Sequence, residues 1–344
     1  MPRLSRCWSL ALGSVGIMLA GGVLVLGAQQ AHDLPLAPHH VHWGYYDAAV
    51  KPVLTIASGD RVRVETMVAR GLERLRLAGV PDVEIPDALK AVEAGVKVRG
   101  PGTHPLTGPI FVNGAEPGDS LEVRIGSIDY LHPYGVIGFL PGGGTLPAEF
   151  PYAYLKLVRF DPGGRTATFA PGVKVPLRPF FGSIGVAPPA LSGRVSSGPP
   201  GFHVGNLDIK EVGAGSTVYL PVHVSGALLS IGDGHAAQGD GEVSGTAIET
   251  SLATTLQIVV HKRKALRYAR IETATHVITV GLDVDLDEAA RIATREMIEY
   301  LVAEKGLSRD DAYVLCSAAV DLRVSQTVDD TKGVHAMLAK ALFP

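Results

Sequence analysis

Side chains able to bind a metal ion or to move protons are concentrated between residues 201 and 257 of this chain. Imidazoles and carboxylates hold divalent metals and act as acids and bases at neutral pH. Glycines separate these side chains, and glycine lets the backbone take positive φ angles and come close to a ligand. The mixture predicts an active site in this stretch. Its polar members are His203, Asn206, Asp208, His223, Asp233, His235, Gln238, Asp240, Glu242 and Glu249.

The composition is that of a globular protein rich in strands and turns. Of the 344 residues, 46% are hydrophobic and 19% are charged, which is enough apolar material for one large domain or two ordinary ones. The 41 glycines and 24 prolines favour short strands joined by tight turns. A net charge of −3 gives no reason to expect nucleic acid as a partner.

The first residues have the layout of a secretory signal peptide. Arg3 and Arg6 precede an uncharged apolar run from Cys7 to Ala28, and small and polar residues follow it. The run is close to the roughly 20 residues that span a bilayer, so a retained membrane anchor is the alternative. We expect an exported protein, periplasmic or secreted, that contacts a membrane only through a retained N-terminal segment. If the start codon is mis-assigned, the protein is cytoplasmic instead.

The pattern of the remaining chain predicts a β-dominated α+β fold. Alternation with period two marks strands between His42 and about Ile128, and Gly and Pro clusters mark loops between short strands over residues 131–200. We expect β-sandwich or jelly-roll-like and small barrel-like sheets with a C-terminal helical α/β portion. The chain then divides into the leader, 1–31; a β-rich part, 32–200; and the site-bearing strands with the C-terminal α+β part, 201–344, which form one catalytic unit.

Capping signals predict the helices. One helix is expected to begin near Pro86 or Asp87. Asp285, with Glu288 three residues later, forms a capping box ahead of a long amphipathic helix, and Ser308 caps the next one. A last helix is expected over residues 332–342. We expect these C-terminal helices to pack on a sheet.

Six segments of the chain carry a resemblance to a known family. They are VHWGYYDAAVKPVLTIASGDRV, LTGPIFVNGAEPGDSLEV, PFFGSIGVAPP, SSGPPGFHVGNLDIKE, VYLPVHVSGALLSIGDGHAAQGDGEVSGTAIETS and KGLSRDDAYVLCSAAVDLRVSQTVDDTKGVHAML. In this order they resemble the acetamidase/formamidase family of amidohydrolases, from about His42 to the C-terminus. Motifs of this length in the same order are highly specific.

The resemblance implies a function and a cofactor. Members of the family hydrolyse short aliphatic amides, such as formamide and acetamide, to ammonia and a carboxylate. They are β-rich, metal-associated and homo-oligomeric. The reaction needs an activated water, a polarised carbonyl and an acid for the leaving nitrogen, and a bound divalent metal would serve the first two. Zinc is the metal that we expect, while the surplus carboxylates also admit Ca²⁺ or Mn²⁺.

Three residues form the predicted set of metal ligands. A catalytic zinc usually has three protein ligands and one open position. His42, Asp208 and His235 are competent ligands in segments that match the family, each flanked by turn or glycine residues. The alternatives are a structural hydrogen bond for His235, a capping or turn carboxylate for Asp208, and packing beside Trp43 for His42.

Carboxylates near these ligands are the predicted acid and base. Glu242 is the preferred general base, and Asp240 would share its face in an extended segment. Glu249 is either the base or a ligand in the place of Glu242. Two carboxylates near one metal tend to have separated pKa values, which suits an acid and a base. The alternative for Asp240 and for Asp233 is a structural role, in which the carboxylate organises a turn by bonding its own backbone.

Polar and aromatic residues nearby are candidates for contact with the substrate. Asn206 and Gln238 could donate hydrogen bonds to the substrate carbonyl, and Trp43 could form a wall of a small pocket. Aromatic core packing explains Trp43 equally well. His203 and His223 are more often structural histidines.

The chain departs from the family pattern at one place near the site. Relatives are expected to have Gly-Gly-Asn before the aspartate, whereas this chain has Val204-Gly205-Asn206. A valine there narrows the backbone choices and reshapes the pocket, which bears on the substrate more than on the reaction class. The leader is a second departure, because the family is associated with the cytoplasm.

Other mechanisms lack support in the sequence. Cys316 lies in an apolar helical stretch that is typical of a buried inert thiol rather than a nitrilase-like nucleophile. Neither GxSxG nor HExxH occurs, so serine-hydrolase and zincin mechanisms are not indicated. The alternative function is that of an exported, non-catalytic β-sandwich that binds a small ligand or a metal.

Overall fold

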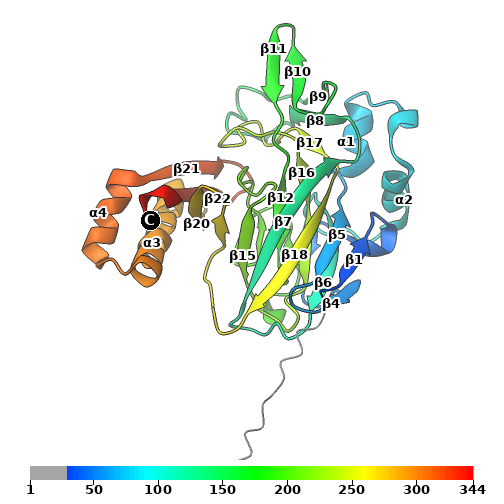
Figure 1. The fold of residues 1–344 in the computed structure, drawn as a ribbon. Coiled ribbons are helices and arrows are strands. Elements are labelled where there is room, and N and C mark those ends of the chain that lie inside the picture. The colour runs from blue at the N-terminus through cyan, green and yellow to red at the C-terminus, as the bar shows by residue number, and fades with distance from the viewer. Residues whose placement is uncertain (1–28, 344) are drawn as a thin grey trace, which may run out of the picture.

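A computed structural model describes residues 29–343 of the chain (Figure 1). Residues 1–28, and with them nearly all of the expected leader, lie outside the described residues. Of the helices that the structure describes, none combines the length and the apolar character needed to cross a membrane.

Two nine-stranded sheets form the body of the described chain. In spatial order, the first sheet contains β1 (Ala31–Leu34), β5 (Arg61–Glu65), β18 (Leu252–His261), β7 (Ser120–Tyr130), β15 (Thr217–Pro221), β19 (Arg270–Glu272), β20 (His276–Asp283), β22 (Lys332–Ala339) and β21 (Val320–Gln326). The second contains β14 (Val204–Asn206), β12 (Phe180–Gly185), β16 (Leu229–His235), β17 (Glu249–Thr250), β8 (Tyr134–Phe139) and β9 (Tyr154–Arg159), with β6 (Pro105–Val112) pairing with β16, β2 (Val41–Trp43) and β4 (Leu54–Ile56).

The two sheets pack face to face around one hydrophobic core. Leu121 and Val123 of β7 lie in the same buried cluster as Phe181 and Ile184 of β12, and all four side chains are fully buried. The core therefore forms between the sheets, as in a sandwich. The β-dominated α+β class is confirmed.

Two short helices cover one side of the sandwich. They are α1 (Gly71–Leu77) and α2 (Asp87–Gly95), whose apolar side chains pack around the buried Trp43. The predicted start of a helix near Asp87 is confirmed, and α1 was not expected. Figure 1 shows both helices on the side of the body opposite to the C-terminal helices.

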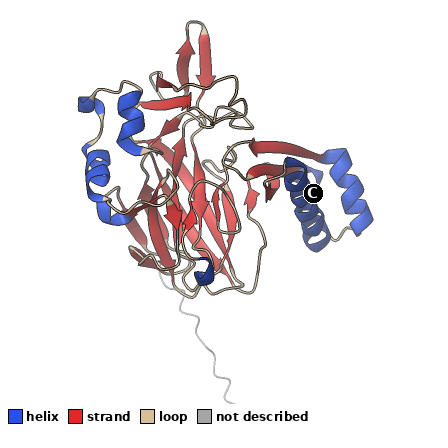
Figure 2. Ribbon diagram, turned by 180° about the vertical axis from the view of Figure 1, so that it is seen from behind, coloured by secondary structure: helices blue, strands red, loops and turns tan. Residues whose placement is uncertain are grey.

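The C-terminal helices begin where their caps predicted. The Asp285 side chain accepts a hydrogen bond from Glu288 N at the start of α3 (Leu286–Lys305), and Ser308 accepts one from Asp311 N at the start of α4 (Arg309–Ala319). Both helices contribute to one hydrophobic cluster with β22, so they pack on the end of the first sheet (Figures 1 and 2). Cys316, on α4, is buried as expected.

The last predicted helix is wrong. Residues 332–339 form strand β22, which pairs antiparallel with both β20 and β21 and is followed by a short 3-10 turn, Lys340–Leu342. Val334, Ala336 and Leu338 face the helices on one side, whereas Met337 reaches the sandwich core on the other. A strand buried on both faces has no polar alternation, and the strand pairs on both edges outweigh the helix propensity of its alanine, leucine and lysine residues.

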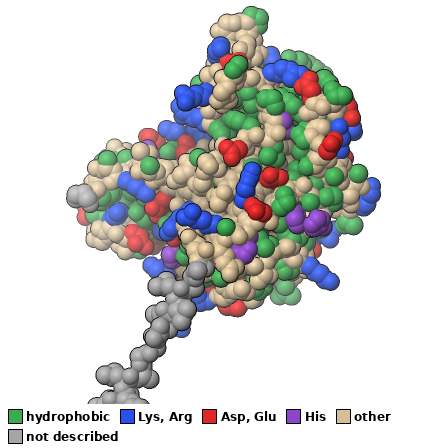
Figure 3. Space-filling model, turned by 45° about the vertical axis from the view of Figure 1, so that its right-hand side comes forward, with side chains coloured by type: hydrophobic (Ala, Val, Ile, Leu, Met, Phe, Trp, Pro, Cys, Tyr) green, Lys and Arg blue, Asp and Glu red, His purple; other side chains and the backbone are tan. Residues whose placement is uncertain are grey.

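Smaller elements complete the fold. A hairpin of β10 (Thr166–Ala170) and β11 (Val173–Pro176) projects from the top of the body in Figure 1, and β13 (Val195–Ser196) pairs with β3 (Tyr45–Tyr46). Lys, Arg, Asp and Glu side chains are interspersed over the face drawn in Figure 3.

Candidate metal centre

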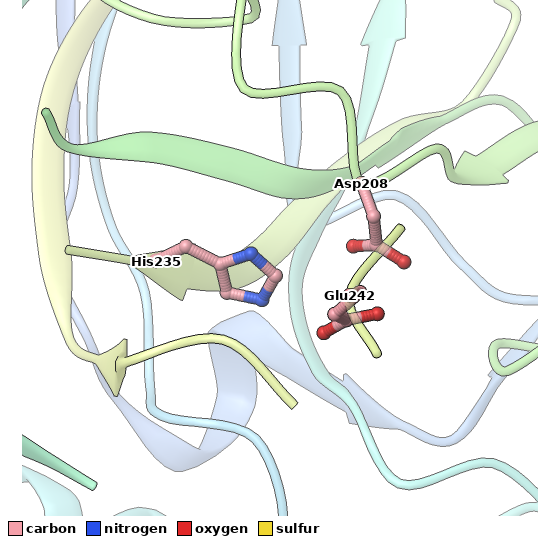
Figure 4. A group of neighbouring side chains, drawn as sticks. All are labelled: Asp208, His235 and Glu242. Atoms are coloured by element: carbon pink, nitrogen blue, oxygen red, sulfur yellow. The ribbon is translucent and has the colours of Figure 1, made fainter. Parts of the chain in front are cut away.

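The acidic and imidazole side chains of residues 201–249 converge at the end of β16. Asp233 and His235 are two positions apart on this strand and therefore share one face. Glu249, on β17, is paired with His235 across the sheet. Asp208 follows β14 and Glu242 lies in the loop after β16. Figure 4 shows the carboxylates of Asp208 and Glu242 beside the His235 ring.

These side chains form two overlapping groups that share His235. The ligand atoms of Asp208, His235 and Glu242 lie within 4.8 Å of one another, and so do those of Asp233, His235 and Glu249. None of the five residues is more than 6% exposed. Four buried carboxylates around one imidazole form an excess of negative charge away from water, which is costly unless a cation or protons compensate it.

The backbone of the acidic residues is unusual. Asp208, Asp233 and Glu242 have φ angles of 52°, 56° and 45°. Asp329, in the loop between β21 and β22, has a φ of 60°. Residues other than glycine seldom adopt this left-handed region, and each such residue costs of order 1–3 kcal/mol. Strained conformations of this kind cluster at functional sites, where the surrounding structure holds them in place.

A glycine leaves room at the centre of the group. A Cβ atom on Gly182, in β12, would lie 2.4 Å from Asp233 Oδ2, 2.5 Å from Asp208 Oδ1 and 2.9 Å from His235 Cε1. The absence of a side chain at Gly182 therefore lets the two carboxylates and the imidazole come together around this point, which any side chain would occupy.

Gln238 fixes the orientation of the His235 ring. The Gln238 amide nitrogen donates to the backbone oxygens of Asp208 and Ser325, at 2.8 and 3.2 Å. This leaves its Oε1 to accept a hydrogen bond from His235 Nδ1 at 3.0 Å. Nε2 then points towards the carboxylates of Asp233 and Glu249, 3.2 and 3.4 Å away. A neutral histidine held in this way presents the Nε2 lone pair to a metal.

Asn206 holds two of the carboxylates. Its amide nitrogen donates to Asp208 Oδ2 at 2.7 Å and to Asp329 Oδ2 at 3.0 Å, while its Oδ1 accepts from the Ser183 hydroxyl. Both amide hydrogens are thus committed to the protein. Asp329 brings the C-terminal part of the chain into the site.

Two basic residues that the sequence did not indicate lie beside the carboxylates of Glu249 and Asp233. Arg74, on α1, is buried, and its Nη1 lies 3.0 Å from Glu249 Oε1 in an ion pair that is not aligned as a hydrogen bond. His104 Nε2 lies 3.8 Å from Asp233 Oδ1. Neither residue lies in the glycine-rich stretch, and their positions follow only from the fold.

Burial and neighbouring charges shift the pKa values of the group. Burial, with the carboxylates of neighbouring acids, raises the pKa of Asp208 and of Glu242 well above the ordinary range. Burial opposes a charge on His235, yet the carboxylates of Asp233 and Glu249 raise its pKa well above the usual value. Burial also raises the pKa of Asp329 to about 6. Without a cation the centre would retain protons on several of these groups, and a divalent ion could replace them.

The residues present fit a divalent metal. Four atoms of the centre have no hydrogen-bond partner within the described part of the chain: Asp208 Oδ1, Asp233 Oδ1, His235 Nε2 and Glu249 Oε2. Buried polar atoms normally have partners, so these four atoms, all within one group of side chains, could be satisfied by a bound cation. Oxygen ligands with one imidazole nitrogen suit zinc, manganese or calcium.

The remaining residues that the sequence indicated lie elsewhere. His42 Nε2 is 2.9 Å from the Ser230 hydroxyl, and burial lowers the pKa of this histidine to about 4. Trp43 packs under the Arg99 guanidinium, 3.8 Å from its ring centroid. Asp240 forms an ion pair with Lys210. The structure thus does not group these three with His235.

The two histidines expected to be structural lie among packing contacts. His203 is buried beside Tyr46, with ring centroids 4.8 Å apart, and His223 Nε2 lies 2.8 Å from the backbone oxygen of Phe202. Val204, at the departure from the family pattern, has a φ of 69°. A β-branched residue is strained there, which agrees with the expectation of a glycine.

Comparison with known proteins identifies the family. The model of the acetamidase/formamidase family matches residues 38–194 and 190–343. The chain belongs to this family. The resemblance seen in the sequence is therefore confirmed.

Similar proteins include named amidases. The chain is 31% identical over 199 residues to the acetamidase of Mycolicibacterium smegmatis, covering 41% of this chain and 49% of that protein. It is 30% identical over 249 residues to the formamidase of Methylophilus methylotrophus, covering 57% and 56%. The chain thus spans about half the length of the curated relatives that it matches.

Solved structures match over a greater length. The crystal structure of a protein of Thermoanaerobacter tengcongensis, described as a predicted acetamidase/formamidase, has a TM-score of 0.79 and 31% identity. The match covers 92% of this chain and 97% of that one. The architecture described above is therefore that of the family.

Proposed function

We propose that this chain is a metal-assisted amidase that hydrolyses a linear amide to ammonia and a carboxylate. The observation that carries the proposal is the buried group of carboxylates around His235, with the space left by Gly182 at its centre. The names of the relatives, acetamidase and formamidase, supply the substrate class of the proposal.

Asp208, His235 and Glu242 would hold the metal. A histidine nitrogen has one lone pair, so the two groups that share His235 are alternative sites for one ion. In the other group, Glu249 already has Arg74 within 3.0 Å and Asp233 has His104 at 3.8 Å. Asp208 and Glu242 have no such basic side chain within salt-bridge distance among the described residues. An ion would therefore compensate the charge of these two carboxylates more than that of Asp233 and Glu249.

The metal and the chain would divide the chemistry between them. A bound divalent cation supplies positive charge that polarises a carbonyl and lowers the pKa of water. Gln238 fixes the orientation of the His235 ring through Nδ1, and Asn206 holds Asp208 in place. Burial keeps bulk water away from the reacting groups, which strengthens each electrostatic interaction.

Glu249 is the best-placed residue to move protons. Its Oε1 pairs with Arg74, while its Oε2 has no hydrogen bond among residues 29–343 and lies 3.4 Å from His235 Nε2. In the reaction, water adds to the carbonyl carbon and the C–N bond breaks. Glu249 would accept the proton that the water loses and return it to the leaving nitrogen, so that ammonia and the carboxylic acid are formed.

Ammonia release and metal content, measured together, test the proposal. Purified protein is assayed on formamide, acetamide and propionamide, before and after chelation and after zinc is restored. We expect Asp208→Asn and Glu242→Gln to lose metal. Glu249→Gln should keep its metal and lose at least about 100-fold in kcat, because it lacks only a proton-transfer group.

The matched control is Glu272→Gln, which changes an acid far from the centre, on β19. It should retain both metal and turnover. A folded, metal-loaded protein that releases no ammonia from any amide would overturn the amidase and leave a binding protein. Turnover that survives complete removal of metal would overturn the metal-assisted mechanism.

A further inference from the structure

A cavity of about 570 Å³ adjoins the metal centre, and the proposed function does not use it. Glu242 and Gln238 both line it, so one wall of the cavity belongs to residues that hold the centre together. Glu242 therefore borders both the cavity and the group of side chains around His235. Its size falls within the range of about 300–1,000 Å³ that is usual for small-molecule sites.

The opposite wall of the cavity is apolar. It comes from β8, from the β10–β11 hairpin, and from the segment on either side of Glu242. Phe169 and Val175, from the hairpin, are half-buried, whereas Val243 at the rim is 63% exposed. The apolar lining residues are Ile137, Phe169, Val175, Ala237, Val243 and Ile248.

Several charged residues of the lining are paired with one another or with Arg323, which lies outside the lining. Lys210 is paired with Asp240, and Arg323 lies 3.5 Å from Glu211 and 3.9 Å from Asp240. Because these charges are already paired within the protein, they contribute little to binding a charged group of a substrate. Arg178, which is exposed, is the remaining cation of the lining.

We propose that this cavity binds the acyl group of the substrate and that the chain prefers amides of larger apolar acids to formamide or acetamide. This inference rests on the proposed amidase function. A formyl or acetyl group would leave most of the cavity to water, whereas a longer alkyl or an arylalkyl chain would cover its apolar wall. Each methylene removed from water favours binding by about threefold to fourfold.

The test compares amides that differ only in their acyl group. Values of kcat/KM are measured for acetamide, hexanamide, phenylacetamide and the monoamide of adipic acid. We expect hexanamide and phenylacetamide to exceed acetamide by at least about tenfold. Equal or falling values with chain length would overturn the inference and leave the amidase function standing. No turnover of any amide would overturn the function itself.

Variants of the β10–β11 hairpin test whether this cavity causes the preference for larger acyl groups. Phe169→Ala should lower the ratio of hexanamide to acetamide kcat/KM by about tenfold, because it removes apolar surface from the wall. Val175→Asp should lower the ratio through a different side chain, which guards against a folding defect in the first variant. Val173→Ala is the control, since Val173 is exposed on the same hairpin and does not line the cavity.

One outcome would point to a different substrate. If the adipic monoamide is preferred to hexanamide and Arg178→Gln removes that preference, the cavity recognises a carboxylate and the apolar assignment is wrong. If hexanamide is preferred and Arg178→Gln leaves the ratio unchanged, the apolar assignment holds.

Discussion

The absence of a side chain at one residue is as important to the centre as the ligands themselves. Gly182 has an ordinary strand conformation, and what it provides is space between Asp208, Asp233 and His235. The carboxylates that surround this space take left-handed backbone angles that cost stability. Such an arrangement supports the proposal that the group binds an ion.

A side chain at Gly182 should weaken metal binding while the fold survives. We expect Gly182→Ala to weaken metal affinity by at least about tenfold and to lower turnover with it, because the methyl group would collide with two carboxylate oxygens. Chelator competition gives the metal dissociation constant, and circular dichroism checks the fold.

Gly239→Ala is the matched control for this substitution. Gly239 lies in the loop between His235 and Glu242, and a Cβ atom there would meet nothing within 4 Å. It should bind metal as the unchanged protein does. Normal affinity in Gly182→Ala would show that the ion lies elsewhere.

Gln238 offers a second prediction at this scale, since it acts through His235. Gln238→Met keeps a similar volume and removes the acceptor that holds Nδ1. Partners of this kind typically contribute 10–100-fold to metal affinity, and we expect a loss of about that size in the same competition assay. Gln257→Met, which changes a glutamine on β18, should have no effect on affinity. An unchanged affinity in Gln238→Met would mean that the ring needs no support to face the ion.

At the scale of elements, the helices of the C-terminal part depend on caps that can be tested. We expect Asp285→Ala to lower the free energy of unfolding by about 1 kcal/mol, because the N-terminus of α3 loses the acceptor for Glu288 N. Asp285→Asn keeps an oxygen at the same place and should restore most of this stability. Urea denaturation of the three proteins measures both effects, and equal stabilities would show that the cap contributes nothing.

Local signals explain what the sequence could predict. The caps at Asp285 and Ser308 act within four residues, so they are visible in any single sequence. Strand β22 was mistaken for a helix because its burial on both faces depends on neighbours that pair with it from elsewhere in the chain. Long-range pairing of this kind leaves no period in the sequence.

The residues of the candidate site were likewise only partly predictable from the sequence. Asp208, His235 and Glu242 were visible because they lie in one glycine-rich stretch. Gly182 reaches them because β12 runs antiparallel beside β16, and Arg74 because α1 packs over the end of β17. No spacing in the sequence could indicate either residue, since sheet register and helix packing bring them to the centre.

At the scale of the whole molecule, burial holds several histidines neutral. Burial lowers the pKa of His132 and of His203 to about 4, below the value of about 6.5 for an exposed histidine. Between these two pH values the unfolded chain binds more protons than the folded one. Stability therefore rises with pH across this window and is lost as the pH falls from about 6.5 towards 4.

His132 is not one of the side chains grouped around His235, so it can be substituted without removing a candidate ligand. Its Nδ1 donates to the backbone oxygen of Tyr134, and its ring stacks on the Tyr134 ring with centroids 4.0 Å apart. His132→Phe keeps an aromatic ring and removes the titration. Between pH 7.5 and pH 5, the unchanged protein should lose about 2 kcal/mol more unfolding free energy than the variant. Contributions from other groups are common to both proteins and cancel in this difference. Urea denaturation of metal-free protein at the two pH values measures it, and parallel losses in the two proteins would mean that His132 takes up its proton without unfolding.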